Sequence, residues 1–186
     1  HIHSARQIFQ AKNCVIATGG LSLKEIGASD FGHRIARQFG HRVTELKPAL
    51  VPFVFNQDLA TLSQLSGIST QVKIKINKHE VLDQILFTKK GFSGPATLKA
   101  SLYYNENDNV EIDFLPQLDL DSVMTQNPSK TMGQLLKEHL PNRLVELLSD
   151  LYEIKLKIKL GEISKKEKGH YSKVFKEFQF KPLKTE

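Results

Sequence analysis

The pattern of apolar residues predicts a strand, a turn and a helix at the start of the chain. Residues 14–17 form a short apolar run closed by two glycines, which is typical of a strand buried on both faces. Apolar positions then recur at helical spacing over 31–39, with Asp30 as the expected N-cap and Gly40 as the stop. Two more strand-like runs follow, at 42–46 and 50–55. This order predicts part of an α/β domain in residues 1–50.

The pattern changes to period-two alternation in residues 51–115. Residues 71–76 alternate polar and apolar side chains, as expected for an antiparallel strand with one buried face. Residues 110–114 alternate in the same way, and apolar pairs within 81–87 indicate another strand. A helix is expected over 94–103, because a proline suits its first turn. These segments predict an antiparallel barrel or sandwich rather than further βαβ units.

The third region, residues 116–186, is predicted to be mainly helical. Its expected helices are 118–124, then 131–140 capped by Ser129, then 142–151 opened by Pro141, and a last helix around 174–178. A returning strand is expected at 178–183. The fold class expected for the whole chain is therefore α+β, with a piece of an α/β domain followed by a barrel-like antiparallel part and a helical part.

The composition narrows the class of protein. The 186 residues are 40% hydrophobic and 25% charged, which is enough apolar material for a sizeable core. Cys14 is the one cysteine, which excludes an intrachain disulfide and fits a reducing compartment, and we expect it to be inert core. The longest apolar run, 49–55, is far shorter than the ~20 residues of a membrane helix, so a cytoplasmic protein is expected. The chain opens on His1, which predicts a piece of a longer protein.

The positive charge lies at the two ends of the chain. The net charge is +4 in residues 1–50, −3 in 51–150 and +5 in 151–186. The lysine-rich end also carries aromatic residues, so contact with nucleic acid or with an acidic partner is one interpretation. A solvated lysine face over an apolar face is the preferred one, because no arginine follows Arg143 and arginine is the better phosphate ligand.

Two turns carry candidate chemistry. The turn formed by Ala17, Thr18, Gly19 and Gly20 lets backbone N–H groups approach a phosphate or a ring, although a purely structural turn explains the tetrapeptide alone. No G-x-G-x-x-G fingerprint and no Walker A motif occurs in the chain.

The second turn is formed by Gly91, Phe92, Ser93, Gly94 and Pro95. A nucleophile elbow needs glycine two residues after the serine, and proline stands there. Ser93 is therefore interpreted as a helix N-cap, with anion binding by the adjacent N–H groups as the alternative. The seven histidines are scattered without metal-ligand spacing, so no metal site is expected.

Six motifs in order resemble a known family. They are 14–20, 27–41, 48–52, 86–88, 91–96 and 140–144. This order and spacing resembles the bacterial aminoacetone-oxidase-like and bile-acid-reductase-like flavoproteins, which are NAD(P)/FAD-dependent oxidoreductases. The resemblance implies that residues 1–50 end the first segment of an FAD-binding domain and that 51–186 form most of an insertion into it. Within the insertion, 51–115 would be the β-rich part and 116–186 the helical part.

The resemblance also implies roles for the two turns. Ala17, Thr18, Gly19 and Gly20 would contact FAD through the main chain, and Gly91–Pro95 would approach the flavin or the substrate. Lys89 stands where the family commonly has histidine, which puts an acid–base role there in doubt, and the catalytic residues stay unknown.

The partners implied are a small-molecule substrate, NAD(P)H and the remainder of the FAD domain, and the fragment alone is expected to be inactive. The alternative is a stand-alone binding or oligomerisation module whose basic C-terminal region contacts nucleic acid or an acidic partner.

Overall fold

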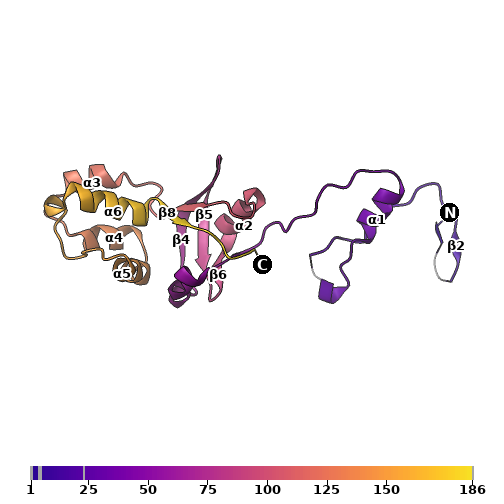
Figure 1. The fold of residues 1–186 in the computed structure, drawn as a ribbon, viewed down its shortest axis with the longest axis horizontal. Helices are drawn as coiled ribbons and strands as arrows, with labels where there is room; N and C mark the ends of the chain where they lie inside the picture. The colour runs from indigo at the N-terminus through magenta and orange to yellow at the C-terminus, as the bar shows by residue number, and fades with distance from the viewer. Residues whose placement is uncertain (1, 4–5, 23, 186) are drawn as a thin grey trace. The chain divides into compact units, whose positions relative to one another are not determined.

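The computed structural model describes residues 2–3, 6–22 and 24–185. The chain divides into two compact units, His1–Lys47 and Pro48–Glu186. Each unit is described by itself below, with the element labels of Figure 1.

The first unit contains little regular structure. Its elements are β1 (Ile2–His3), β2 (Ile8–Phe9), the 3-10 helix η1 (Lys24–Ile26) and α1 (Phe31–Gln38). The helix is confirmed, and it ends before Gly40, whose φ of +78° suits a glycine. Asp30 occupies the N-cap position but forms no capping hydrogen bond; its carboxylate pairs with Arg34 at 3.1 Å instead.

The strands expected at 14–17 and 42–46 are not formed, and the prediction is wrong for both. Cys14 is exposed rather than core, and the Val15 side chain is 85% exposed. A strand buried on both faces needs neighbouring strands and covering helices. Within this unit the described strands are only the two-residue β1 and β2, so the apolar run has nothing to pair with.

The second unit is built on six antiparallel strands in the order β3-β6-β5-β4-β7-β8. The strands are β3 (Phe53–Val54), β4 (Ser69–Ile76), β5 (His79–Phe87), β6 (Gly91–Ser93), β7 (Val110–Asp113) and β8 (Phe178–Phe180). The helices are η2 (Gln57–Leu65), α2 (Gly94–Ala100), η3 (Ser101–Tyr103), α3 (Leu120–Gln126), α4 (Met132–His139), α5 (Asn142–Leu151), η4 (Leu160–Glu162) and α6 (Lys165–Phe175). The fold is α+β, as expected from the sequence.

The centre of the sheet follows the alternation that the sequence predicts. In β4, Val72, Ile74 and Ile76 are buried, whereas Lys73 and Lys75 lie on the outer face. Glu80 on β5 is within 4 Å of both lysine ammonium groups, at 3.5 Å and 3.7 Å. The strand therefore has one apolar face and one charged face.

The sheet curls because its two ends meet. β3 is the first strand in the order and β8 is the last, yet the segment that follows β8 pairs with β3. Val54 donates its N–H to the Lys184 carbonyl at 3.0 Å and accepts one from Leu183 at 3.0 Å. Phe53 thus lies between Phe92 of β6 and Thr185. This pairing closes the sheet into a barrel-like form.

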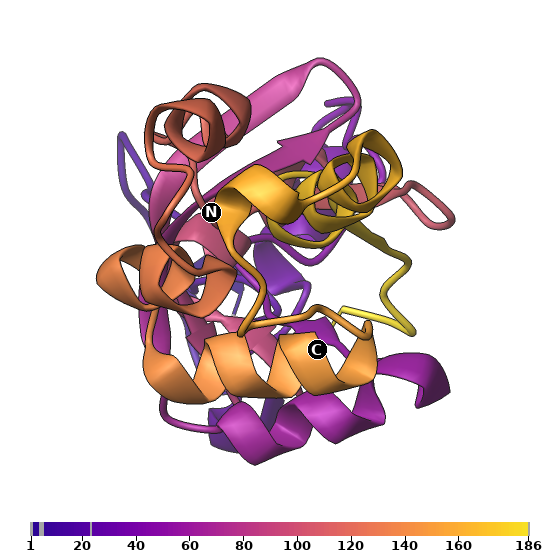
Figure 2. The same ribbon diagram turned by 90° about the vertical axis from the view of Figure 1, so that its left-hand side faces the viewer.

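The helices α3–α6 gather on one side of the strands, and α2 lies on the other side (Figure 1). The cap of α4 is Thr131, which forms a reciprocal capping box with Gln134, so the prediction of Ser129 as the cap is wrong. Figure 2 shows α5 alongside η2, where Arg143 donates to the Gln64 carbonyl. The helix η2, whose buried residues are Leu59, Leu62 and Leu65, is not predicted from the sequence pattern.

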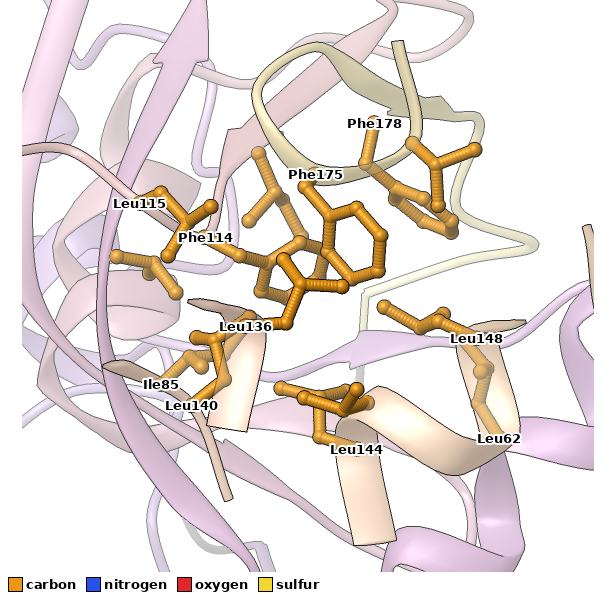
Figure 3. Close-up of a cluster of buried hydrophobic side chains, with 14 of the residues drawn as sticks. Leu62, Ile85, Phe114, Leu115, Leu136, Leu140, Leu144, Leu148, Phe175 and Phe178 are labelled. Atoms are coloured by element: carbon orange, nitrogen blue, oxygen red, sulfur yellow. The ribbon is translucent and has the colours of Figure 1, made fainter. Parts of the chain in front are cut away.

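The strands and the helices of the second unit share one core. Ile85 and Phe114 pack with Leu136, Leu144 and Leu148 of the helices (Figure 3). The change from strands to helices near residue 116 is therefore not a break in the packing. In the part of the chain that the structure describes, no helix is long and apolar enough to cross a membrane.

Candidate functional site

The glycine turn at Ala17–Gly20 is open. Gly19 has a φ of +69°, and a Cβ placed on Gly19 or on Gly20 would meet no atom within 4 Å. The first half of the turn and the residue before it lie beside the start of α1, since a Cβ on Gly32 would be 3.5 Å from the Thr18 hydroxyl oxygen and 3.6 Å from a methyl carbon of Ile16. The main chain at the turn is thus accessible to a flat ligand, as a dinucleotide ring would require.

The second candidate, the loop at Lys89–Pro95, begins with a turn held by Thr88. The Thr88 hydroxyl donates to the Gly91 carbonyl at 2.9 Å and accepts from the Gly91 N–H at 3.1 Å. It also accepts from the Lys90 N–H at 3.3 Å. Threonine hydroxyls stabilise turns in this way, so Thr88 positions the exposed Lys89. Thr88 is not among the site residues predicted from the sequence, although a threonine before Lys-Lys-Gly is a recognisable turn signal.

The glycines of this loop are required by close packing of the backbone. A Cβ on Gly91 would lie 1.8 Å from the Phe53 carbonyl oxygen, which no side chain permits. Gly94 has a φ of +85°, and its Cβ would lie 2.8 Å from the Leu86 nitrogen. The loop is therefore a rigid part of the barrel, and Phe92 is buried inside it.

Ser93 stands at the N-cap position of α2 but forms no capping hydrogen bond, so its expected capping role is wrong. Its backbone is extended there, with φ −134° and ψ −159°. Pro95 occupies the first turn of the helix, as the sequence predicts.

A shallow cavity of about 270 Å³ lies beside this loop. Its walls include Lys89, Gly91 and Ser93 from the loop, together with Pro52 and Val54 from the chain around β3. Pro52 and Val54 are not among the site residues predicted from the sequence, because only the β3–β6 pairing brings them next to the loop. An exposed ammonium group and a hydroxyl at the same cavity fit a polar or anionic ligand.

The two turns belong to different compact units. Among the described residues, no group of three or more His, Cys, Asp and Glu side chains could hold a metal ion.

The lysines of the C-terminal region fall into two classes. Lys176 has a structural role: its ammonium lies 3.0 Å from Asp113 and donates to the Leu115 and Leu118 carbonyls. Lys155 pairs with Glu167 at 2.9 Å. The exposed lysines of this region with no ion pair within residues 24–185 include Lys157, Lys159, Lys165, Lys166, Lys173 and Lys181. Part of the lysine-rich end is therefore available for contact with other molecules.

Comparison with known proteins supplies a family. Residues 47–186 match the HI0933-like protein barrel and H2TH domain. The match covers the whole second unit and one residue of the first, Lys47.

Three characterised relatives are similar to the chain. Two are named ribosomal RNA dihydrouridine synthase: one from Haemophilus influenzae, 40% identical over 144 residues, and one from Escherichia coli, 40% identical over 146. Each alignment covers 75% of this chain and 36% of the relative. The 3-dehydro-bile acid delta(4,6)-reductase of Clostridium scindens is 25% identical over 180 residues, covering 87% of this chain and 44% of the relative. The chain thus spans well under half the length of these relatives.

Proposed function

Because the chain belongs to the HI0933-like family, we propose that it is the barrel and helical part of a flavin-dependent reductase that acts on uridine in ribosomal RNA. The observation that carries this proposal is the 40% identity to two relatives that both bear the name ribosomal RNA dihydrouridine synthase. The weaker similarity to a bile-acid reductase supports reduction as the common chemistry. The sequence alone implies a small-molecule substrate and gives contact with nucleic acid only as the less favoured alternative; here RNA is proposed as the substrate.

The open glycine turn supports a cofactor site in the complete protein. Ala17–Gly20 would contact FAD through main-chain atoms, since no side chain covers Gly19 or Gly20. The exposed apolar residues before the turn, Val15 and Ile16, would pack against the remainder of the FAD-binding domain. This remainder would supply the sheet that the strand expected at 14–17 lacks.

The residues of the second unit would bind and orient the substrate. FAD held by the main chain of Ala17–Gly20 would supply hydride chemistry for reducing the carbon–carbon double bond of a uracil ring, with NAD(P)H as the source of the hydride and a proton taken up at the second carbon. Lys89, positioned by Thr88, would place its ammonium beside a phosphate or carbonyl oxygen of the substrate. Ser93, whose hydroxyl does not cap α2, would offer a hydrogen bond at the same cavity.

The test uses the complete protein that contains this chain. A flavin spectrum, NAD(P)H oxidation that depends on RNA, and new dihydrouridine in unmodified ribosomal RNA are the expected results. Lys89→Gln should lower the rate with RNA while leaving the flavin spectrum unchanged. Lys78→Gln is the matched control, because Lys78 is an exposed lysine of the turn between β4 and β5 and does not line this cavity. A colourless protein that FAD cannot reconstitute would contradict the proposal. Reduction of a bile-acid substrate and not of RNA would correct the substrate class.

The alternative of a stand-alone binding or oligomerisation module predicts different results. The chain would then be self-sufficient, and light scattering would show a stable oligomer whose formation does not depend on flavin.

A further inference from the structure

Two cavities of the second unit share Tyr152, where α5 ends, as a lining residue. One, of about 410 Å³, opens towards α6 and is lined in part by His170 and Lys173. The other, of about 390 Å³, opens towards the barrel and is lined in part by Asn109 and Lys181. Both have Tyr152 and Gln179 in their walls. We call this pair of cavities the Tyr152 groove; it involves none of the residues of the Lys89–Pro95 loop.

The Tyr152 ring packs against the core and also lines the two cavities. Its ring meets Phe178 of the core edge-on, with centroids 6.0 Å apart and planes at 89°. Its carbonyl oxygen lies 2.7 Å from Nε2 of His170. The ring is half-buried, and no hydrogen bond of its hydroxyl is found among residues 24–185. A fixed aromatic ring with a free hydroxyl, facing two cavities, is suited to a flat polar ligand.

Positive charges stand at both ends of the groove. On α6, Lys166, His170 and Lys173 follow the spacing i, i+4 and i+7, so they share one exposed face of the helix that leads to Tyr152. Lys181 stands at the other cavity. Neither Lys166, Lys173 nor Lys181 has an ion pair in the described part of the chain. Lysines without counterions are the groups that nucleic-acid phosphates attract.

Two carboxylates also line the groove: Asp58 at the barrel side and Glu177 at the α6 side. Burial raises the pKa of Tyr152, and the nearby Asp58 charge adds to the effect. The hydroxyl therefore stays a neutral donor at physiological pH. Each cavity thus carries one carboxylate and one lysine, so the phosphates would have to lie nearer to Lys173 and Lys181 than to Glu177 and Asp58.

The amides at the groove differ in availability. Asn56 uses both of its side-chain atoms, since Oδ1 accepts from the Leu59 N–H and Nδ2 donates to the Lys181 carbonyl. Asn109 is exposed and forms no side-chain hydrogen bond within residues 24–185. A free amide can donate to and accept from the edge of a base.

We propose that the Tyr152 groove binds one unpaired base of a single-stranded RNA segment. The base would stack on the exposed part of the Tyr152 ring, Asn109 would contact its edge, and the flanking phosphates would lie near Lys173 and Lys181. This inference rests on the proposed RNA substrate and names a contact site for it away from the Lys89 loop. Cavities of this size accept a base, whereas paired bases in a duplex are not available for stacking.

The test measures the fluorescence anisotropy of a labelled single-stranded RNA oligonucleotide titrated with the 186-residue chain. Tyr152→Leu should raise Kd roughly tenfold, and Tyr152→Phe should restore most of the affinity, because stacking needs only the ring. The matched control is Tyr103→Leu, which removes an exposed tyrosine stacked on His79 and should leave Kd unchanged. Lys173→Gln with Lys181→Gln should make log Kd depend less steeply on log salt concentration, by a slope of about 1–2.

Other results would overturn the groove. The first is an equal Kd for Tyr152→Leu, Tyr152→Phe and the unaltered chain, and the second is no RNA binding at all. The third is a Kd for duplex RNA that rises as much in Tyr152→Leu as the Kd for single-stranded RNA. The fourth is displacement of the RNA by polyglutamate of equal total charge. Circular dichroism and the thermal midpoint establish that each variant is folded. Because this assay needs no flavin, the two proposals fail separately. A complete protein that binds no flavin would contradict the reductase proposal but not the proposal that the Tyr152 groove binds a base. Dihydrouridine formation together with an unchanged RNA affinity in Tyr152→Leu would contradict only the proposal that the Tyr152 groove binds a base.

Discussion

The two units use their apolar residues in opposite ways. In residues 48–186, apolar side chains from strands and helices form one continuous core, with Leu144 and Phe92 fully buried. In residues 1–47, Val15 is 85% exposed and Phe39 is 75% exposed. Both parts contain strand-like and helix-like sequence, so local pattern is not the difference. The difference is whether the sequence supplies the partner surfaces that bury the pattern.

The comparison implies that the stability of the chain resides in the second unit. Burial of a large apolar side chain contributes about 1.5–3 kcal/mol, and an exposed one contributes little. Substitutions in the two units should therefore have very different effects on the free energy of unfolding. The following variants test this from the largest expected effect to the smallest.

Leu144→Ala should lower the free energy of unfolding by about 2–5 kcal/mol, because it opens a cavity where α5 meets the core. Leu151→Ala, on the same helix but 42% exposed, is the control and should cost less than about 1 kcal/mol. Urea denaturation followed by circular dichroism measures both. Similar losses for the two variants would contradict the assignment of the core to this face of α5.

Gly91→Ala should cost about 1–3 kcal/mol or more, because its Cβ would overlap the Phe53 carbonyl and force β3 away from β6. Gly169→Ala is the opposite case: no atom lies within 4 Å of its Cβ, and alanine suits α6 better by about 1 kcal/mol. Thermal unfolding should thus shift down for the first variant and up for the second. A neutral Gly91→Ala would exclude the close β3–β6 approach.

Glu167→Gln should change how stability depends on pH. Hydrogen bonds from Ser164, followed by that from Lys155, lower the pKa of Glu167 from 4.5 to about 2. Because the pKa is lower in the folded state, the ionised carboxylate stabilises the fold above pH 4.5, and this stabilisation is lost as the pH falls towards 2.

The variant should be less stable at neutral pH and should lose less stability on acidification through that window. Glu162→Gln, an exposed carboxylate on η4, is the control and should keep the pH dependence of the unaltered chain. Parallel pH profiles for the unaltered chain and Glu167→Gln would exclude the capping role of Glu167.

Val15→Ser should change the free energy of unfolding of the chain by less than about 0.5 kcal/mol, because the side chain is already exposed. In the complete protein the same substitution should weaken flavin retention, if Val15 packs against the remainder of the FAD domain as proposed. A large loss of stability in the chain alone would show that 14–17 is buried in solution, against the contrast drawn between the units.

Sequence reasoning succeeded where a local pattern determines the structure. The alternation at 71–76 predicts β4, and the spacing of Leu144 and Leu148 predicts the buried face of α5. It failed at 14–17, because an apolar run does not reveal whether its neighbours are present. It also missed η2, whose leucines recur at three-residue intervals among polar residues rather than in a helical stripe.

The candidate sites show the same limit. Lys89 and Gly91–Pro95 are adjacent in sequence and could be found by motif, and their roles stay predictions. Pro52 reaches the same cavity only through strand pairing. Tyr152, Asn109 and Lys181 meet only because β8 returns to the barrel after the helices, and no spacing in the sequence signals that approach.

The pairing of Val54 with Leu183 and Lys184 has a consequence for how this unit is attached. The two stretches run antiparallel, so the first strand of the unit and the segment after its last strand lie side by side. A unit whose two ends lie close together can be inserted into one loop of a neighbouring domain without disturbing the rest of that domain. Loss of the hydrogen bonds between Val54 and residues 183–184 would therefore open the barrel and separate the two ends of the unit at once.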